Sequence, residues 1–132
     1  MRIYYSHSMK LYGTKAEKEE VAIIKKNFPH VAIINPPSFD GSERKRREGM
    51  TFCHRLIDDC DVLVFSRLFG VTTSGVGSEV NYALKKGKKV FEIKDGNLIP
   101  HDKPLKYISR NQTVRIYRII DRNEALKRKI NR

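Results

Sequence analysis

Short apolar runs alternate with amphipathic segments along most of the chain. The runs that indicate buried strands span residues 3–5, 31–34, 61–66 and 88–93. Strands that are apolar on both faces and alternate with helices are typical of a parallel sheet that is covered on both sides. We therefore expect an α/β fold, namely a three-layer flavodoxin- or Rossmann-like domain with a parallel sheet of about five strands.

Apolar stripes at helical spacing place helices between these strands. Residues 14–17 (TKAE) form a capping-box pattern, which predicts that a helix begins after Thr14. A second helix is expected around residues 50–60, and a third over residues 76–86. A terminal helix is expected to open at Asp121.

The segment before the terminal helix carries two further expectations. Residues 94–111 contain Asp95-Gly96 and two prolines, which indicates an irregular loop. Residues 113–119 alternate between polar and apolar side chains, so we expect the fifth strand there, at an edge of the sheet.

Length and composition indicate one soluble domain over residues 1–132, with no internal repeat and no linker. The chain is 39% hydrophobic and 32% charged, and no apolar run approaches the length of a membrane span. No signal peptide is visible, and Cys53 and Cys60 lie two helical turns apart, too far for a disulfide with each other. We expect a cytoplasmic protein with no metal and no cofactor, because the sequence shows no metal-ligand spacing.

The net charge of +12 indicates an acidic partner. Phosphate groups on a nucleotide or a nucleic acid would be attracted by such a field, whereas solvated helix faces would need no partner. The sequence contains no arginine-rich tract with interleaved aromatics. We therefore favour a small anionic ligand over a nucleic acid.

Polar residues follow the carboxyl ends of the expected strands, where ligands bind in open α/β sheets. Ser6, His7 and Ser8 follow the first strand, and Asn35 follows the second. The third strand leads through Ser66-Arg67 to the turn at residues 72–79. These segments should lie along one rim.

The turn at residues 72–79 (TTSGVGSE) leads from a strand into a helix and is rich in hydroxyl groups and glycine. Free N–H groups and the positive end of a helix dipole make such a turn an anion site. Glu79 has two interpretations. It is either an acid in the first helical turn that offsets the dipole, or a carboxylate at the cleft that acts as nucleophile or base. Val76 lies where a capping box would need Ser or Thr, which weakens the interpretation of Glu79 as a capping acid.

The turn after the first strand offers further ligand contacts. Ser6 and Ser8 could hold a phosphate or a sugar hydroxyl, with His7 as a donor. Tyr4 and Tyr5 alternate in direction, so one should lie in the core and the other could stack on a base. The basic cluster at residues 44–47 could reach over the cleft. The chain has no Gly-x-Ser-x-Gly elbow, no Walker A loop and no complete Gly-x-Gly-x-x-Gly.

The stretch from Gly75 to Ala83, followed by Gly87-Lys88-Lys89-Val90, resembles the nucleoside 2-deoxyribosyltransferases and the related 2'-deoxynucleoside 5'-phosphate N-hydrolases. The resemblance extends over roughly residues 1–93 and takes in the first strand, its serine turn and Ile34-Asn35-Pro36. It implies a flavodoxin-like sheet and a glutamate that attacks the anomeric carbon, which corresponds to Glu79.

The resemblance also implies the substrate contacts. Hydroxyls that bind phosphate or sugar correspond to Ser6, Ser8 and Thr73, beside Gly75 and Gly77, and an aromatic that packs on the base corresponds to Tyr5. Relatives often share site residues across a dimer, so a homodimer is implied. The family carries another acid two helical turns before the third strand, where this chain has Cys53 and His54. Either His54 substitutes for that acid or the substrate differs.

These observations lead to one principal hypothesis and three alternatives. The principal hypothesis is N-glycosidic bond hydrolysis or transfer on a nucleotide or (deoxy)nucleoside, with Glu79 as nucleophile. A phosphoribohydrolase-like enzyme is disfavoured because its doubled glycine and its threonine are missing. A non-catalytic nucleotide-binding or sensor domain would use Glu79 as a ribose or base contact. A basic nucleic-acid-binding domain is the weakest alternative.

Overall fold

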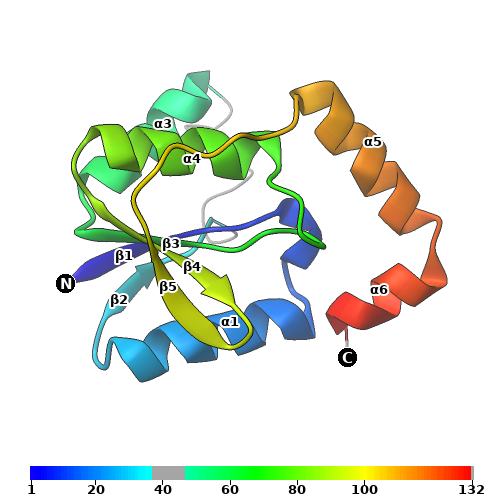
Figure 1. Ribbon diagram of the computed structural model, residues 1–132, viewed down its shortest axis with the longest axis horizontal. Helices are drawn as coiled ribbons and strands as arrows, with labels where there is room; N and C mark the ends of the chain where they lie inside the picture. Colours follow the sequence, from blue (N-terminus) through cyan, green and yellow to red (C-terminus); the bar gives the residue numbers. More distant parts are fainter. Residues whose placement is uncertain (37–46, 132) are drawn as a thin grey trace.

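The computed structural model describes residues 1–36 and 47–131, and its centre is a five-stranded sheet in the order β2-β1-β3-β4-β5 (Figure 1). The strands are β1 (Arg2–Ser6), β2 (Ala32–Ile34), β3 (Val62–Phe65), β4 (Lys89–Lys94) and β5 (Asn97–His101). β1 is parallel to both β2 and β3, and β3 is parallel to β4. β5 is antiparallel to β4. The α/β class is confirmed, but the sheet is mostly parallel rather than wholly parallel.

The strand order creates a switch point between β1 and β3. The chain moves from β1 outward to β2, then returns past β1 to form β3 and continues to β4. Crossovers on either side of β1 therefore lead in opposite directions. A crevice is expected beyond the carboxyl ends of β1 and β3, which are the ends that carry Ser6 and Phe65.

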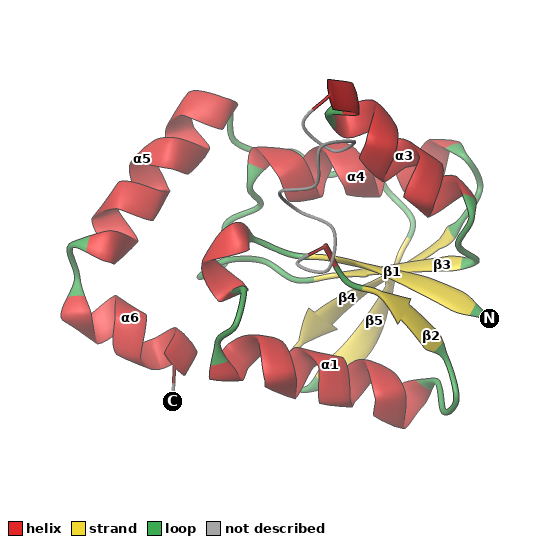
Figure 2. Cartoon of the chain, turned by 180° about the vertical axis from the view of Figure 1, so that it is seen from behind, coloured by secondary structure: helices red, strands yellow, loops and turns green. Residues whose placement is uncertain are grey.

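Helices pack against both faces of the sheet (Figure 2). The helices with described bounds are η1 (Met9–Leu11), α1 (Lys15–Asn27), α3 (Met50–Asp58), α4 (Ser74–Lys85), α5 (Arg110–Asp121) and α6 (Glu124–Asn131). Those on the faces of the sheet are α1 on one side and α3 and α4 on the other. Thr14 caps α1 as predicted, with its side chain accepting a hydrogen bond from the Glu17 N–H. Ile24 of α1 packs with Ile3 and Tyr5 on one face of the sheet.

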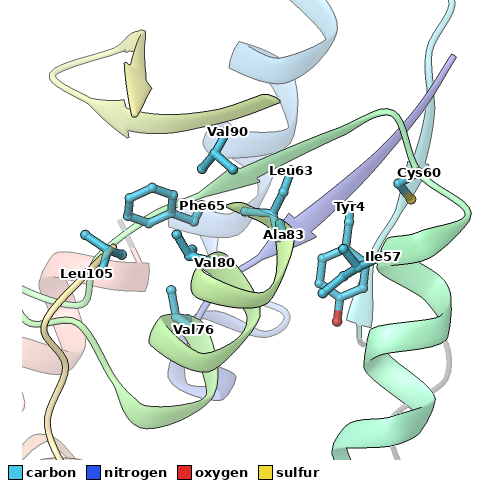
Figure 3. Packing of buried hydrophobic residues seen from close by; sticks show 10 residues of the cluster. All are labelled: Tyr4, Ile57, Cys60, Leu63, Phe65, Val76, Val80, Ala83, Val90 and Leu105. Carbon is cyan, nitrogen blue, oxygen red and sulfur yellow. The ribbon is translucent and has the colours of Figure 1, made fainter. Parts of the chain in front are cut away.

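The opposite face packs against α3 and α4 (Figure 3). Tyr4, Leu63 and Phe65 meet Ile57 of α3 and an apolar stripe on α4. That stripe consists of Val76, Val80 and Ala83. Because successive residues of a strand point to opposite faces, Tyr4 belongs to this side and Tyr5 to the side of α1.

The expected fifth strand at residues 113–119 is wrong, because these residues belong to α5. Ser109 and Gln112 form a capping box at its start. The side chains that α5 turns inward recur at helical spacing; they are Thr113, Ile116, Tyr117 and Ile120. The alternation seen in the sequence was therefore a part of a helical stripe.

The fifth strand lies instead in the segment expected to be an irregular loop. Asp95 and Gly96 both have positive φ, 52° and 77°, as in the tight turns that favour hairpins. They join β4 to β5, so Asp-Gly marks a hairpin here. Pro100 is tolerated in β5 because this strand is at the edge of the sheet.

The C-terminal helices pack beside the ends of the strands rather than over the sheet (Figure 1). Ile120 of α5 and Ile130 of α6 form a third apolar cluster with Leu11 of η1 and Leu68 of the loop after β3. Two polar contacts add to this packing. Ser8 donates to the Tyr117 hydroxyl over 3.0 Å, and Lys10 pairs with Asp121 over 2.6 Å.

Candidate active site beyond the carboxyl ends of β1 and β3

A cavity of about 380 Å³ opens at the switch point. The turn after β1, η1, α3, the first turns of α4 and the inner face of α5 all contribute to its wall. The residues that line it are His7, Ser8, Met9, Tyr12, Met50, Cys53, Thr73, Ser74, Gly75, Val76, Glu79, Arg110, Thr113, Val114 and Tyr117. The crevice that the strand order implies is therefore present, and it has a wall from α5.

Glu79 is the carboxylate in this wall, and its side chain is fixed by two hydroxyl groups of β1. The Tyr4 hydroxyl donates to Oε2, and Ser6 Oγ donates to Oε1 over 2.9 Å. The residue as a whole is 8% exposed. Burying a carboxylate is costly unless its oxygens accept hydrogen bonds, and bonds to an ionised group are the strong ones. The arrangement suits a carboxylate held in one orientation against the cavity.

The expectation that Glu79 lies in the first turn of its helix is wrong. α4 begins at Ser74, two residues earlier than predicted, and Thr73 is its N-cap. The first turn contains no acid, and Glu79 is the sixth helical residue. Because the dipole effect is confined to the first turn, it does not account for an acid at this position.

Tyr4 is the proton donor of the pair. Its pKa is raised far above the usual range, first by burial, then by the negative charge of Glu79 and by Cys53. A phenol with so high a pKa stays protonated and donates to the carboxylate. Cys53 lies in the cavity wall on the adjacent α3.

The start of α4 contributes hydroxyl groups and backbone donors to the cavity. Thr73 lines it, and its side chain makes no capping hydrogen bond. The first four N–H groups of a helix have no partner within it. Thr113 Oγ1 accepts from the Ser74 N–H over 3.1 Å, so α5 satisfies one of them. Arg110, at the start of α5, brings a cation to the same wall.

The two glycines of the predicted motif face different parts of the molecule. Gly75 lines the cavity, and a Cβ built on it would meet nothing within 4 Å. A Cβ on Gly77 would lie 2.3 Å from the Tyr107 ring. The lack of a side chain at Gly77 therefore lets Tyr107, in the segment before α5, pack closely against α4. Gly77 does not line the cavity.

His7 lines the cavity, but both of its ring nitrogens face protein oxygens. Nδ1 lies 3.3 Å from the Tyr5 carbonyl oxygen, and Nε2 lies 2.6 Å from Glu17 Oε2. The ring stacks on Tyr5 with centroids 3.7 Å apart. The structure thus uses the His7 nitrogens to tie the turn after β1 to α1, rather than as free donors to a ligand.

Four other predicted site residues, Tyr5, Ser6, Asn35 and His54, do not line the cavity. Tyr5 is fully buried under α1, where its hydroxyl donates to Glu20. Asn35 follows β2 and is half-buried. His54 stacks on Tyr82 of α4, with centroids 3.8 Å apart, and burial lowers its pKa. Ser6 reaches the site through Glu79.

The basic cluster expected to reach over the cleft lies mostly outside the described residues, because residues 44–46 are among those not described. Arg47 is described and is exposed. The sequence analysis missed the wall from α5, which supplies Arg110, Thr113, Val114 and Tyr117. The signal that could have found it was the helical stripe over residues 113–120, preceded by Ser109.

Several site types are not seen in the part of the chain that the structure describes. No group of three or more His, Cys, Asp or Glu side chains could hold a metal ion there. No helix within residues 1–36 and 47–131 is long and apolar enough to cross a membrane. Cys53 and Cys60 are both buried thiols, and burial raises the pKa of Cys60 to about 11.

Comparison of the chain with protein-family models, with curated proteins and with solved structures finds no match. Function must therefore be argued from the cavity and its residues.

Proposed function

We propose that the cavity cleaves an N-glycosidic bond, with Glu79 as the nucleophile. The single observation that supports this most is the placement of Glu79, a buried carboxylate that two hydroxyl groups orient in the wall of a cavity at the switch point. The resemblance of residues 75–90 to nucleoside deoxyribosyltransferases supports the same role. A ligand-binding domain is the alternative that the test below separates.

The chemistry follows from the charge of the carboxylate. Glycosyl transfer passes through an oxocarbenium-like state, which a nearby carboxylate stabilises. Glu79 attacks the anomeric carbon, the C–N bond breaks, and the base leaves with the bonding electrons and takes a proton from solvent. The resulting glycosyl ester is then cleaved by water or by a second base. Tyr4 and Ser6 each donate to one oxygen of the carboxylate and so fix the orientation of Glu79 for the attack.

The remaining wall supports a nucleotide as the substrate. Ser8, Thr73 and the N-terminal turn of α4 offer donors to a phosphate, and Arg110 offers a positive charge. Met9, Met50 and Val114 offer an apolar surface for a base. The cavity lining thus offers donors and a cation to a phosphate and apolar side chains to a base.

The proposal also includes the fold family, the location and the oligomeric state of the protein. A flavodoxin-like, three-layer domain would place its ligand at this switch point. A cytoplasmic homodimer, as the resemblance implies, is a part of the proposal.

The test is to incubate the protein with a panel of ribo- and deoxyribonucleotides and nucleosides and to follow the release of free base. The matched pair of variants is Glu79→Gln and Glu20→Gln, because Glu20 makes similar hydrogen bonds away from the cavity. We expect release by the wild type and by Glu20→Gln, but not by Glu79→Gln. Tight nucleotide binding without release by the wild type would overturn the proposal and support a sensor domain.

A further inference from the structure

The positive charge of the protein is concentrated at one end of the chain. Residues 103–131 contain nine Lys or Arg and two Asp or Glu, which gives +7 of the total of +12. By contrast, α1 contains four Lys and three Glu, a net charge of +1. The charge is therefore a property of the C-terminal segment rather than of helix surfaces in general.

The two acids in this segment already have partners. Asp121 pairs with Lys10 over 2.6 Å, and Glu124 pairs with Lys127 over 3.0 Å. Apart from Arg110, which lines the cavity, the remaining exposed cations of α5 and α6 are Arg115, Arg118, Arg122, Arg128 and Lys129, with Arg122 directly after α5. Within the described ranges, no ion pair involves any of these five side chains. We call these five residues the basic outer face.

The arginines of α5 form a row. Arg115, Arg118 and Arg122 follow one another at i, i+3 and i+7, so they share one side of the helix. This side is opposite Ile116 and Ile120, which pack towards the body. At a rise of about 1.5 Å per residue, the row spans about 10 Å, the length of several phosphates along a strand.

The type of side chain and the packing favour a nucleic acid over a membrane. All cations of α5 are arginine, whose planar fork binds phosphate oxygens in pairs. An interfacial membrane helix needs a free apolar face. On α5, Ile116 and Ile120 instead pack in the cluster with Leu11 and Leu68. The exposed apolar side chains Val114 and Ile119 lie five residues apart, on different sides of the helix, so they do not form one apolar face.

We propose that the basic outer face binds the phosphate backbone of a nucleic acid, independently of base sequence. The proposal does not depend on the proposed chemistry of the cavity. The two features nevertheless share a helix, since Arg110 and Val114 line the cavity while Arg115 and Arg118 point outward. A strand on α5 would therefore pass beside the mouth of the cavity.

The experiment measures binding of a fluorescein-labelled single-stranded DNA of mixed sequence by fluorescence anisotropy over a range of salt concentrations. The test variant is R115Q/R118Q/R122Q. The matched control is K18Q/K25Q/K26Q, which removes the same charge from exposed positions of α1. Phosphatidylserine vesicles serve as the second ligand.

We expect the arginine variant to bind DNA at least about tenfold more weakly, with the slope of log K against log salt shallower by about two. The control should lie within about twofold of the wild type, because its lysines are not in the row. Equal losses in both variants, no DNA binding by the wild type, or binding to vesicles in place of DNA would overturn the proposal. Base release from mononucleotides, measured on the same variants, reports on the cavity separately.

Discussion

The two sides of β1 carry the same three chemical groups. On the side of α4, Tyr4 and Ser6 donate to Glu79. On the side of α1, Tyr5 of β1 and Ser66, which follows β3, donate to Glu20. Each set is a tyrosine, a serine and a glutamate. We call them the Glu79 triad and the Glu20 triad.

The two triads differ in access rather than in chemistry. Glu79 lines the cavity, together with Thr73 and Cys53, whereas Glu20 does not. Burial raises the pKa of Glu20, and the charges of Glu17 and Glu19 add to the rise, while the Tyr5 and Ser66 hydrogen bonds oppose it. Glu20 is half-buried and belongs to a polar cluster between α1 and the sheet, outside the cavity.

The comparison shows that a hydrogen-bonded carboxylate does not identify an active site by itself. Each triad supplies hydrogen bonds to an acid that is buried (Glu79) or half-buried (Glu20), and both tyrosines have a raised pKa because of burial. The Glu79 triad presents its acid to the cavity at the switch point, and the Glu20 triad does not. Four predictions test whether the Glu79 triad serves catalysis while the Glu20 triad serves only stability.

The largest effect is expected from exchanging each glutamate for its amide. Glu79→Gln should lower kcat for base release by at least about 10³-fold, because the nucleophile is lost. Glu20→Gln should leave kcat unchanged, because Glu20 does not line the cavity. Single-turnover base release measures both. Similar losses of kcat in the two variants would mean that the triads are not functionally distinct.

Exchange of the tyrosines is expected to affect stability in both triads and kcat in only one of them. Tyr4→Phe and Tyr5→Phe should each lower the free energy of unfolding by about 1–3 kcal/mol, because each removes a hydrogen-bond donor from a carboxylate that is buried or half-buried. Tyr4→Phe should also lower kcat by about 10- to 100-fold, because Glu79 is less well oriented. Urea unfolding and base release measure the two quantities. Retention of full kcat by Tyr4→Phe would show that Tyr4 does not position the nucleophile.

The serines give a smaller contrast. Ser6→Ala removes one neutral donor from Glu79 and should lower kcat by about three- to tenfold. Ser66→Ala should leave kcat unchanged and lower the free energy of unfolding by about 1 kcal/mol. Steady-state kinetics and thermal unfolding of the purified variants measure the pair. A larger kinetic defect in Ser66→Ala than in Ser6→Ala would contradict the assignment of the cavity to the Glu79 triad.

The smallest effect concerns the pH dependence of stability. The folded pKa of Glu20 is raised above its usual value of 4.5, so its contribution is present below that value and is lost as pH rises through the folded pKa. The wild type should therefore lose stability relative to Glu20→Gln as pH increases from acidic to neutral. Urea unfolding of both proteins at several pH values measures this difference. A difference that grows in favour of the wild type with pH would have the wrong sign.

Much of the scaffold could be predicted because it depends on contiguous patterns. The capping box before α1, the four apolar runs and the stripe over α4 each lie within one short segment. The same is true of the polar residues after β1 and β3, which the parallel sheet brings to one end. The hairpin and the helix at residues 110–121 also have local signals, namely Asp95-Gly96 and the capping box of Ser109 and Gln112. Two nearby prolines and the alternation over residues 113–119 indicate other structures and obscure these signals.

Patterns within short segments show that the chain alternates strands and helices, and that an acid follows a glycine-rich turn. The contact of Glu79 with Tyr4, 75 positions away, and that of Tyr117 with Ser8, 109 positions away, emerge only in the folded molecule. Periodicity and capping act within a few residues, whereas a cavity wall depends on packing between distant segments. The same packing decided that Gly77 faces Tyr107 and that Tyr5, one residue from Tyr4, belongs to the other triad.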